Sequence, residues 1–296
     1  MIYYFVPDIT IFGGIKVAYQ FVDALNLLGV PAVIASPQGR AATWFLSHAA
    51  VVDAEAAREM FRTEDIAIFS LPHDYERLRN LPGKVFYHCM GTDPLIDPIL
   101  KDPSVEVLTC WKQAQEYVLS HGVKRPFDVG ISISPSFSYA GEPKYERAVA
   151  YMPRRGRELC ESVMNTCSSV RYIKIDGMAE NEVALVMKSC SIFLATAEHE
   201  WYGLPALEAM SAGCVVVSVP VIGGMEYLHN GINCRVAGLL DFTDVVNGLL
   251  SPESAFLRFR LRQSAIATSK NYTFSRMLNR ISGLLNGPLS SWKKCE

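Results

Sequence analysis

The sequence predicts an α/β protein with two similar domains, each built on a parallel sheet. Short apolar runs alternate with longer stretches of helical periodicity, which is typical of strand-helix-strand units. This alternation stops in a stretch rich in Ser, Pro and Gly at 127–145 and then starts again. The chain has 296 residues, 50% of them hydrophobic, which is enough for two packed cores.

The first half begins with one complete unit of this pattern. An apolar strand at 2–6 leads to a turn at Gly13 and Gly14. A helical pattern over about 15–28 then precedes a second strand at 32–35. The alternation continues and predicts three more strands and a helix, namely strands at 66–69, 84–88 and 106–109 and a helix at about 112–120.

The second half repeats the pattern after the crossing stretch. It predicts four strands and three helices: strands at 148–152, 170–175, 191–195 and 215–219, and helices near 158–165, 180–188 and 205–212. Near the end of the chain, 274–285 has apolar residues at helical spacing, and this helix could pack on either half.

Composition excludes several classes of protein. The chain carries 28 Lys and Arg against 30 Asp and Glu, so no broad basic field favours nucleic acid as a partner. No window approaches the roughly 18 apolar residues of a membrane span, and the first residues read as a strand and not as a leader. The eight cysteines form no Cys-x-x-Cys pair. We therefore expect buried thiols and a cytoplasmic location.

The most informative segment, at 198–213, directly follows the apolar strand 191–195. Pro205 suits the first turn of a helix, because its missing N–H would have no partner there. The amides of Gly203 and Leu204 then form an exposed helix N-terminus, which favours an anion such as phosphate. Ligands bind at this end of the strands in open parallel sheets.

Two glutamates flank this predicted anion site. Carboxylates accept hydrogen bonds from vicinal hydroxyls, as on a ribose or a hexose, so Glu200 and Glu208 could grip sugars on either side of a phosphate. A helix cap plus a surface glutamate paired with a base explains the spacing equally well. The spacing alone leaves both interpretations open.

The run from 200 to 217 resembles the Glu-x7-Glu motif of retaining glycosyltransferases with the B-type fold (GT-B, glycosyl transferases group 1 or family 4-like). Both glutamates, Gly-Leu-Pro, Glu-Ala-Met and the later Val-Val are in register with that motif. The segments 223–233 and 272–275 also resemble the family, whereas the first half resembles it more loosely. The resemblance implies two Rossmann-like domains facing each other across a cleft, with a last helix that crosses back to the first domain. The implied boundaries are 1–137 with 273–296 for the acceptor side and 138–272 for the donor side.

The resemblance also implies roles for residues of the second half. Glu200 would hold hydroxyls of the donor sugar, Glu208 the ribose, and the amides of Gly203 and Leu204 the sugar and the distal phosphate. The family spaces an Arg and a Lys after the first strand of this domain, and here that place carries a cluster of arginines, Arg154, Arg155 and Arg157. Which of them reaches the diphosphate stays open, and a solvated charge cluster is the alternative. Gly177 and Met178 occupy the loop that holds the base in this family, although Met178 could simply pack.

In the first half, the resemblance places Gly13 and Gly14 in the loop that faces the donor diphosphate and the acceptor. His88 occupies the position of a histidine near the transferred sugar, although a hydrogen-bonded core histidine is equally consistent with the end of a buried strand. Lys16, one turn into the first predicted helix, could face the acceptor, but its position favours an ordinary surface lysine. Trp201 and Tyr202 could wall the sugar or pack under the loop.

The implied reaction transfers a sugar from a nucleotide-diphosphate donor, such as a UDP-, GDP- or TDP-sugar, to a hydroxyl of a carbohydrate or glycoconjugate acceptor with retention. Because the sequence has no Asp-x-Asp carboxylate motif, we expect no metal and no other cofactor. Glu200, His88 and Arg155 are the predicted catalytic residues. The alternatives are a nucleotide-sugar-binding protein or an epimerase of the same fold, and a weak peripheral membrane contact is left open.

Overall fold

The computed structural model describes residues 1–154, 156–167 and 170–294. They form two compact units: unit 1 comprises Met1–Ser132 and the C-terminal segment from Phe274, and unit 2 comprises Ile133–Thr273. Each unit has one sheet, and all the strand pairs in both sheets are parallel. The predicted α/β class with two similar halves is therefore confirmed.

The sheet of unit 1 has the strand order β3-β2-β1-β4-β5-β6-β7. The strands are β1 (Ile2–Phe5), β2 (Ala32–Ser36), β3 (Val51–Asp53), β4 (Ile66–Phe69), β5 (Lys84–Cys89), β6 (Val105–Thr109) and β7 (Phe127–Asp128). The order runs outward from β1 in two directions, so the point where it reverses lies between β1 and β4. In doubly wound sheets that switch point is where ligands bind.

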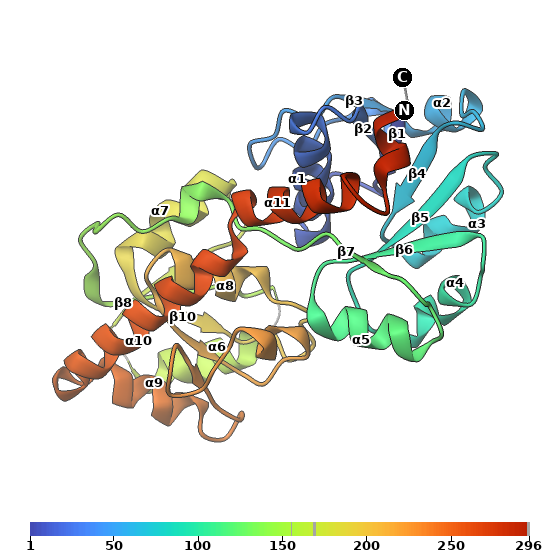
Figure 1. The fold of residues 1–296 in the computed structure, drawn as a ribbon. Coiled ribbons are helices and arrows are strands. Elements are labelled where there is room, and N and C mark those ends of the chain that lie inside the picture. Colours follow the sequence, from blue (N-terminus) through green and yellow to red (C-terminus); the bar gives the residue numbers. More distant parts are fainter. Residues whose placement is uncertain (155, 168–169, 295–296) are drawn as a thin grey trace. The chain divides into compact units, whose positions relative to one another are not determined.

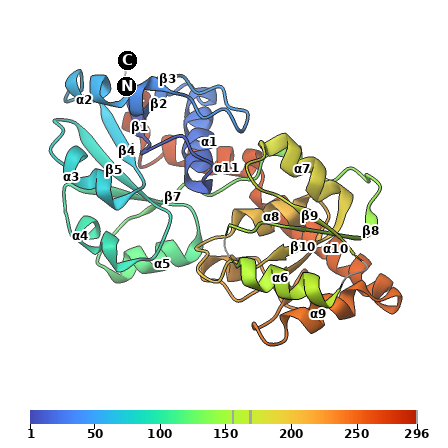
Figure 2. The ribbon, with the colours of Figure 1, turned by 180° about the vertical axis from the view of Figure 1, so that it is seen from behind.

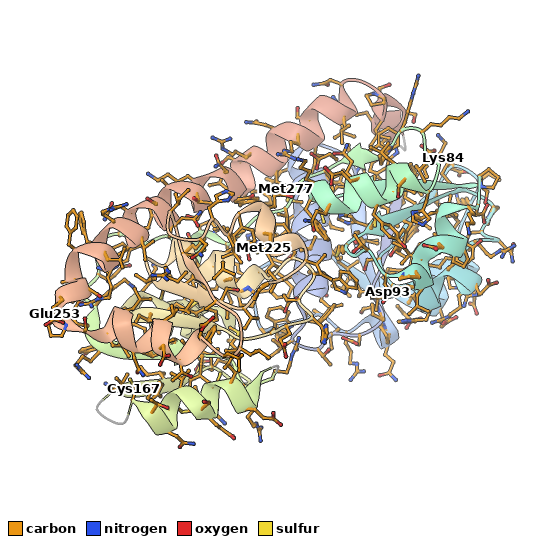
Figure 3. The ribbon with its side chains drawn as sticks, turned by 90° about the horizontal axis from the view of Figure 1, so that it is seen from below. Lys84, Asp93, Cys167, Met225, Glu253 and Met277 are labelled. Atoms are coloured by element: carbon orange, nitrogen blue, oxygen red, sulfur yellow. The ribbon has the colours of Figure 1, made fainter. Side chains whose placement is uncertain are left out.

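The α-helices that the structure describes in unit 1 pack around its sheet. They are α1 (Gly13–Leu27), α2 (Ala54–Glu59), α3 (Tyr75–Leu78), α4 (Asp97–Leu100), α5 (Lys112–Ser120) and α11 (Phe274–Leu285). Although far apart in sequence, α1 and α11 lie side by side (Figure 1). One face of α11 is buried through residues one helical turn apart, among them Met277 and Ile281 (Figure 3). Trp292 then packs against Phe21 and Phe86, so the end of the chain completes the core of unit 1.

The sheet of unit 2 has the strand order β12-β11-β10-β8-β9. Its strands are β8 (Tyr145–Tyr151), β9 (Arg171–Lys174), β10 (Cys190–Ala195), β11 (Val215–Ser218) and β12 (Arg235–Val236). Its helices are α6 (Arg157–Thr166), α7 (Glu180–Ser189), α8 (Leu204–Ser211), α9 (Phe242–Leu250) and α10 (Ala255–Ser269). Helices α6 and α9 pack together on one face of the sheet, while α7 and α10 both contact α8 (Figure 2).

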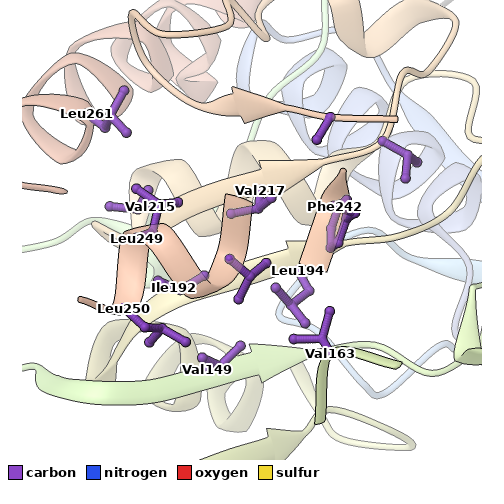
Figure 4. Packing of buried hydrophobic residues seen from close by; sticks show 13 residues of the cluster. Val149, Val163, Ile192, Leu194, Val215, Val217, Phe242, Leu249, Leu250 and Leu261 are labelled. Carbon is purple, nitrogen blue, oxygen red and sulfur yellow. The ribbon is translucent and has the colours of Figure 1, made fainter. Parts of the chain in front are cut away.

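Aliphatic side chains from the two central strands of unit 2 form its core. Ile192 and Leu194 of β10 and Val215 and Val217 of β11 are buried against Phe242 of α9 and its neighbours (Figure 4). Residues at i and i+2 of a strand share one face, so the alternation of these positions fixes the register of the sheet. This packed layer holds the carboxyl ends of the strands, and the loops that follow them, in place.

The segment that leads into unit 2 is fixed by one carboxylate. The hydroxyls of Ser134 and Ser136 donate to Glu180 at 2.8 and 3.1 Å, and the amide of Ile133 donates to the carbonyl of Tyr272. These bonds place 133–137 in unit 2, so the boundary falls after residue 132 and not after the predicted residue 137. The last helix, which starts at Phe274, belongs to unit 1.

The cysteines of the described residues are all free, and only Cys167 is more than slightly exposed. Among the described residues, no helix is both long and apolar enough to cross a membrane. Within the same ranges, His, Cys, Asp and Glu side chains form no cluster of three or more that could hold a metal ion. A cytoplasmic location and a metal-free reaction stay predictions.

Candidate functional site

The switch point of the unit 2 sheet lies between β8 and β10. These strands are parallel neighbours, but the chain goes from β8 to β9 on one side and then returns to β10 on the other. Two loops therefore leave the sheet here in opposite directions: 152–156 after β8 and 196–203 after β10. The first contains Arg154 and the second Glu200 and Gly203. The fold thus brings Arg154 of the predicted cluster and the predicted motif to one edge of the sheet.

Gly156 joins these two loops by close backbone packing. A Cβ on Gly156 would lie 2.1 Å from the carbonyl oxygen of Thr196, and the residue has a φ of 78°. A Cβ would not fit that contact, and residues other than glycine rarely adopt that conformation. Below it, Cys160 at the start of α6 lies 3.4 Å from the hydroxyl of Thr196. The arginine loop is therefore pinned to the first residue after β10.

The N-terminus of α8 is built as the sequence indicated. Gly203 caps the helix in the left-handed conformation, with φ 81° and ψ 51°, and Pro205 stands in the first turn. The first N–H groups of any helix have no partner within it and carry its positive end. At this end of α8 those groups belong to Gly203 and Leu204, so the predicted anion-binding amides are present in the expected geometry.

One predicted glutamate precedes this N-terminus and the other lies within α8. Glu200 is partly exposed in the loop, and a Cβ on Gly203 would lie 3.4 Å from its Cγ. Glu208 is on the second turn of α8 and is only 7% exposed. Both carboxylates act on the hydroxyl of Tyr227, because their charges add to burial in raising its pKa well above the usual range. The structure therefore brings Glu200 and Glu208 together around the start of α8.

The loop after β11 hydrogen-bonds to the backbone of the segment that contains Glu200. Its amides at Ile222 and Gly223 donate to the carbonyls of Glu200 and Trp201. A Cβ on Gly224 would lie 3.0 Å from the carbonyl oxygen of Tyr202 and 2.6 Å from Val221. The backbone of the motif is thus held on both flanks. Tyr202 packs beneath the loop, which is the second of its two predicted roles.

The remaining predicted residues of unit 2 lie at the same edge of the sheet. Arg154 is exposed after β8, whereas Arg155 falls outside the described residues. Gly177 and Met178 follow β9, and Gly177 has a φ of 66° with open space where a Cβ would be. Met178 is partly exposed. A role of these residues toward a nucleotide stays a prediction.

A separate cavity of about 340 Å³ also lies in unit 2. It is lined by Arg235, Asp241, Asp244, Val245, Gly248, Leu249, Ser254 and Leu257. None of the predicted site residues lines it, so it provides a rival location for a ligand.

In unit 1, Gly13 and Gly14 begin α1 after the loop that leaves the central strand β1. The loop lies at the switch point of that sheet. A Cβ on Gly14 would lie 3.1 Å from the ring of Phe12 and 3.6 Å from the sulfur of Met90, so the turn packs against apolar side chains. Their predicted contact with a diphosphate stays untested.

His88 lies inside the core of unit 1. It is 0% exposed on β5, its Nδ1 is 2.9 Å from the hydroxyl of Tyr4, and its ring packs near Phe21. Burial lowers the pKa of His88 to about 3, so the ring is neutral near pH 7. This environment is that of the hydrogen-bonded core histidine, the alternative that the sequence left open. The surface interpretation of Lys16 is wrong, since this side chain is only 3% exposed.

The sequence does not predict two residues that lie at this edge of unit 2. Gly156 stands among arginines, and its close contact with Thr196 joins residues distant in sequence. Its local signal is a glycine that soon follows a strand. The hydroxyl of Tyr227 lies 2.6 Å from the carbonyl oxygen of Gly203, a contact that no local sequence pattern predicts.

Comparison with known proteins gives a family match for part of unit 2. Residues 172–240 match the family described as Glycosyl transferases group 1. An alpha-1,6-glucosyltransferase of Actinobacillus pleuropneumoniae serotype 7 (strain AP76) is 33% identical over 104 residues. That match covers 32% of this chain and 32% of the relative, so it spans about a third of each.

Solved structures resemble the whole chain. Sucrose-phosphate synthase from Thermosynechococcus elongatus has a TM-score of 0.73 at 11% identity and covers 98% of this chain and 99% of its own. A glycosyltransferase from Rickettsia africae has a TM-score of 0.69 at 12% identity, over 99% and 98%. HepE from Anabaena, in complex with UDP and glucose, has a TM-score of 0.66 at 12% identity, over 96% and 99%.

The comparisons thus show the fold of the whole chain and a family match for one segment of unit 2. The solved neighbours share both sheets, and the matched segment runs from β9 through α8 and β11. The chain therefore has the GT-B fold, and its residues 172–240 match the glycosyl transferases group 1 family, which the sequence resembles.

Proposed function

We propose that this chain is a glycosyltransferase that transfers a sugar from a nucleoside-diphosphate sugar to an acceptor hydroxyl with retention of configuration. One observation carries the proposal: at the switch point of unit 2, Gly156 pins the arginine loop against the motif that contains Glu200 and the N-terminus of α8. Carboxylates beside an exposed helix N-terminus and a basic loop fit a ligand that has both hydroxyls and phosphates.

Each part of this edge suits one part of the donor. The amides of Gly203 and Leu204 hold the distal phosphate, and the partly exposed Glu200 accepts hydrogen bonds from the sugar hydroxyls. Glu208, which is nearly buried on the next turn of α8, accepts from the ribose. Arg154, which is exposed in the loop after β8, donates hydrogen bonds to the diphosphate.

The departing nucleoside diphosphate gains negative charge as the sugar leaves. Helix amides and arginines stabilise such charge where they are already oriented for it. They supply the stabilisation that a divalent cation gives elsewhere, so we propose a metal-independent reaction. Retention follows if the leaving phosphate takes the proton of the acceptor on the face from which it departs, since both glutamates are occupied with hydroxyls.

The comparisons suggest the first donor to test. HepE is described in complex with UDP-glucose, and the curated relative is a glucosyltransferase, which supports a UDP-hexose as donor and a carbohydrate as acceptor. HepE is similar to this chain in fold, whereas the glucosyltransferase is similar in sequence over about a third of its length. The panel must therefore include GDP-, TDP- and ADP-sugars.

A thermal-shift panel of nucleoside-diphosphate sugars tests this function directly. Ligands that bind only the folded protein raise its melting temperature by mass action, so one donor class should raise Tm while free hexoses do not. If no nucleoside diphosphate or its sugar raises Tm or gives a measurable Kd, the function is wrong.

Glu200→Gln separates transfer from binding. The amide keeps the shape of the carboxylate but loses its charge, so transfer should fall on the order of 100-fold while donor affinity falls much less. Glu198→Gln, in the same loop and exposed, is the matched control and should keep its activity.

The second candidate is a protein that binds nucleotide sugars without transferring them, or an epimerase of the same fold. The same geometry supports donor binding in each case. A binding protein shows a donor Kd but no transfer before any substitution, and an epimerase converts the donor sugar without an acceptor.

A further inference from the structure

Tyr227 lies beneath the loop that leads into α8. It follows the short helix η5 (Gly223–Glu226) in sequence and is 1% exposed. Its hydroxyl donates to the carbonyl oxygens of Gly203 at 2.6 Å and Tyr202 at 3.0 Å, so two successive carbonyls share one proton. A Cβ on Gly203 would lie 3.0 Å from that hydroxyl, which leaves no room for a larger residue there.

The directions of these two carbonyls determine the directions of two backbone N–H groups. In a trans peptide the C=O and the N–H of one unit point in opposite directions, and the described chain has no cis peptide. The carbonyl of Tyr202 shares its peptide with the N–H of Gly203, and that of Gly203 shares its peptide with the N–H of Leu204. Because both carbonyls converge on Tyr227, both N–H groups point away from it, on the same side.

We propose that Tyr227 is a positioning residue that aims the amides of Gly203 and Leu204 at the distal phosphate of the donor. This inference rests on the proposed function of the same edge. Tyr227 touches no donor atom in this account, since it is buried on the carbonyl side of the peptides. It acts only by fixing the orientation of the two peptide planes.

The surroundings of Tyr227 suit such a role. Its own carbonyl accepts from the side-chain amide of Asn233 at 2.8 Å, and its amide donates to Gly224 at 3.1 Å. The rings of Tyr202 and Tyr272 pack on it with centroids 5.4 and 6.0 Å away. Burial and the charge of Glu200 raise the pKa of Tyr227 well above its usual range, so the hydroxyl keeps its proton and stays a donor at any ordinary pH.

Another tyrosine of unit 2 provides a matched control. The hydroxyl of Tyr172 on β9 also donates to two main-chain carbonyls, those of Val163 at 3.4 Å and Cys167 at 3.2 Å. Those carbonyls belong to the C-terminal end of α6, not to the start of α8. Tyr172→Phe therefore removes the same kind of bond without touching the predicted phosphate site.

The test compares UDP with UMP, because only UDP has the distal phosphate. In the full chain, Tyr227→Phe should weaken UDP about 10-fold, the equivalent of one net hydrogen bond, and leave the Kd of UMP within about twofold. Tyr172→Phe should leave both constants unchanged. If the best donor carries another base, the corresponding mono- and diphosphate replace this pair.

Two outcomes overturn the inference. Tyr227→Phe could bind UDP as tightly as the wild type, or it could lose UDP and UMP equally, which is the mark of a general structural defect. Failure of the proposed function differs from both, because the wild type would then bind no nucleoside diphosphate at all.

A measurement on the wild type covers the case in which Tyr227→Phe does not fold. In amide spectra titrated with UDP, the signals of Gly203 and Leu204 should shift together and more strongly than with UMP. If the two signals stay in place while UDP binds, the amides do not face the phosphate and the inference is wrong.

Discussion

The switch points of the two sheets carry different chemistry. In unit 2, the edge between β8 and β10 presents Arg154, Glu200 and the helix amides of α8, over backbone packed closely enough to require Gly156. In unit 1, the loop after β1 presents Ile11 and Phe12, which are 41% and 39% exposed. The same loop also exposes Asp8 and Thr10, and the amide and hydroxyl of Thr10 both donate to the Asp8 carboxylate, but the loop has no arginine. The basic group and the exposed helix amides that would suit a sugar diphosphate thus lie at the edge in unit 2.

The largest effect is expected from breaking the packing that assembles the unit 2 edge. Gly156→Ala places a methyl group against the carbonyl of Thr196 in a left-handed conformation, and should lower the free energy of unfolding by about 3 kcal/mol or more. Gly231→Ala, with a φ of 77° and open space around it, should cost only about 1 kcal/mol. Urea unfolding of both variants measures this. Equal losses would mean that the contact with Thr196 is unimportant.

The next effect concerns the opposite ends of the helices. The ammonium of Lys144 donates to the carbonyls of Met187, Lys188, Cys190 and Ala212 at 2.9 to 3.1 Å, and so closes the C-terminal ends of α7 and α8. Lys144→Met leaves these carbonyls without that donor and should cost about 3 kcal/mol of unfolding free energy. Lys188→Met, which removes one ion pair with Glu142, should cost less than about 1 kcal/mol. Similar losses in urea titrations would contradict this ranking.

A smaller effect tests the interior of unit 1. Because burial lowers the pKa of His88 to about 3, the unfolded chain takes up a proton below pH 6.5 that the folded chain refuses. His88 therefore contributes stability above that pH, and the contribution is lost as the pH falls toward 3. Between pH 7.5 and 5 it should lower the unfolding free energy by about 2 kcal/mol.

Unfolding curves of His88→Gln and His48→Gln at both pH values check this. His88→Gln should not show this loss of unfolding free energy between pH 7.5 and 5. His48→Gln, which changes an exposed residue, should still show it. If the His88 resonance titrates near pH 6.5 in the folded protein, the imidazole reaches solvent, and its predicted place near the transferred sugar regains support.

Much of the fold followed from local sequence signals. The helices predicted at 112–120 and 274–285 have the observed bounds, since each has a regular apolar stripe or clear flanking residues. The sequence pattern predicts neither α9 nor α10, and in α10 Arg258 interrupts the buried apolar face. That arginine is 6% exposed and donates to the carbonyls of Leu249 and Ser251 at the end of α9, a partnership that no local pattern reveals.

The candidate site likewise has a part that local sequence predicts and a part that it does not. The cap at Gly203 and Pro205 follows from helix chemistry within a few residues, so it was predictable. Whether His88 faces a cleft or the core depends on Tyr4 and Phe21, more than 60 positions away, and on which side of β5 they cover. A local motif can be predicted from a few neighbouring residues. The burial of a side chain on a central strand depends on residues from the whole sheet.

Hydrogen exchange, measured with and without the donor that binds best, tests directly whether the switch point of unit 2 is the donor site. Bound donor should protect the backbone amides at 196–204, together with those of the loops after β8 and β11, and leave the segment 235–257 that lines the 340 Å³ cavity unchanged. Protection confined to 235–257, with none around Gly203, would contradict the central claim that the switch point of unit 2 is the donor site.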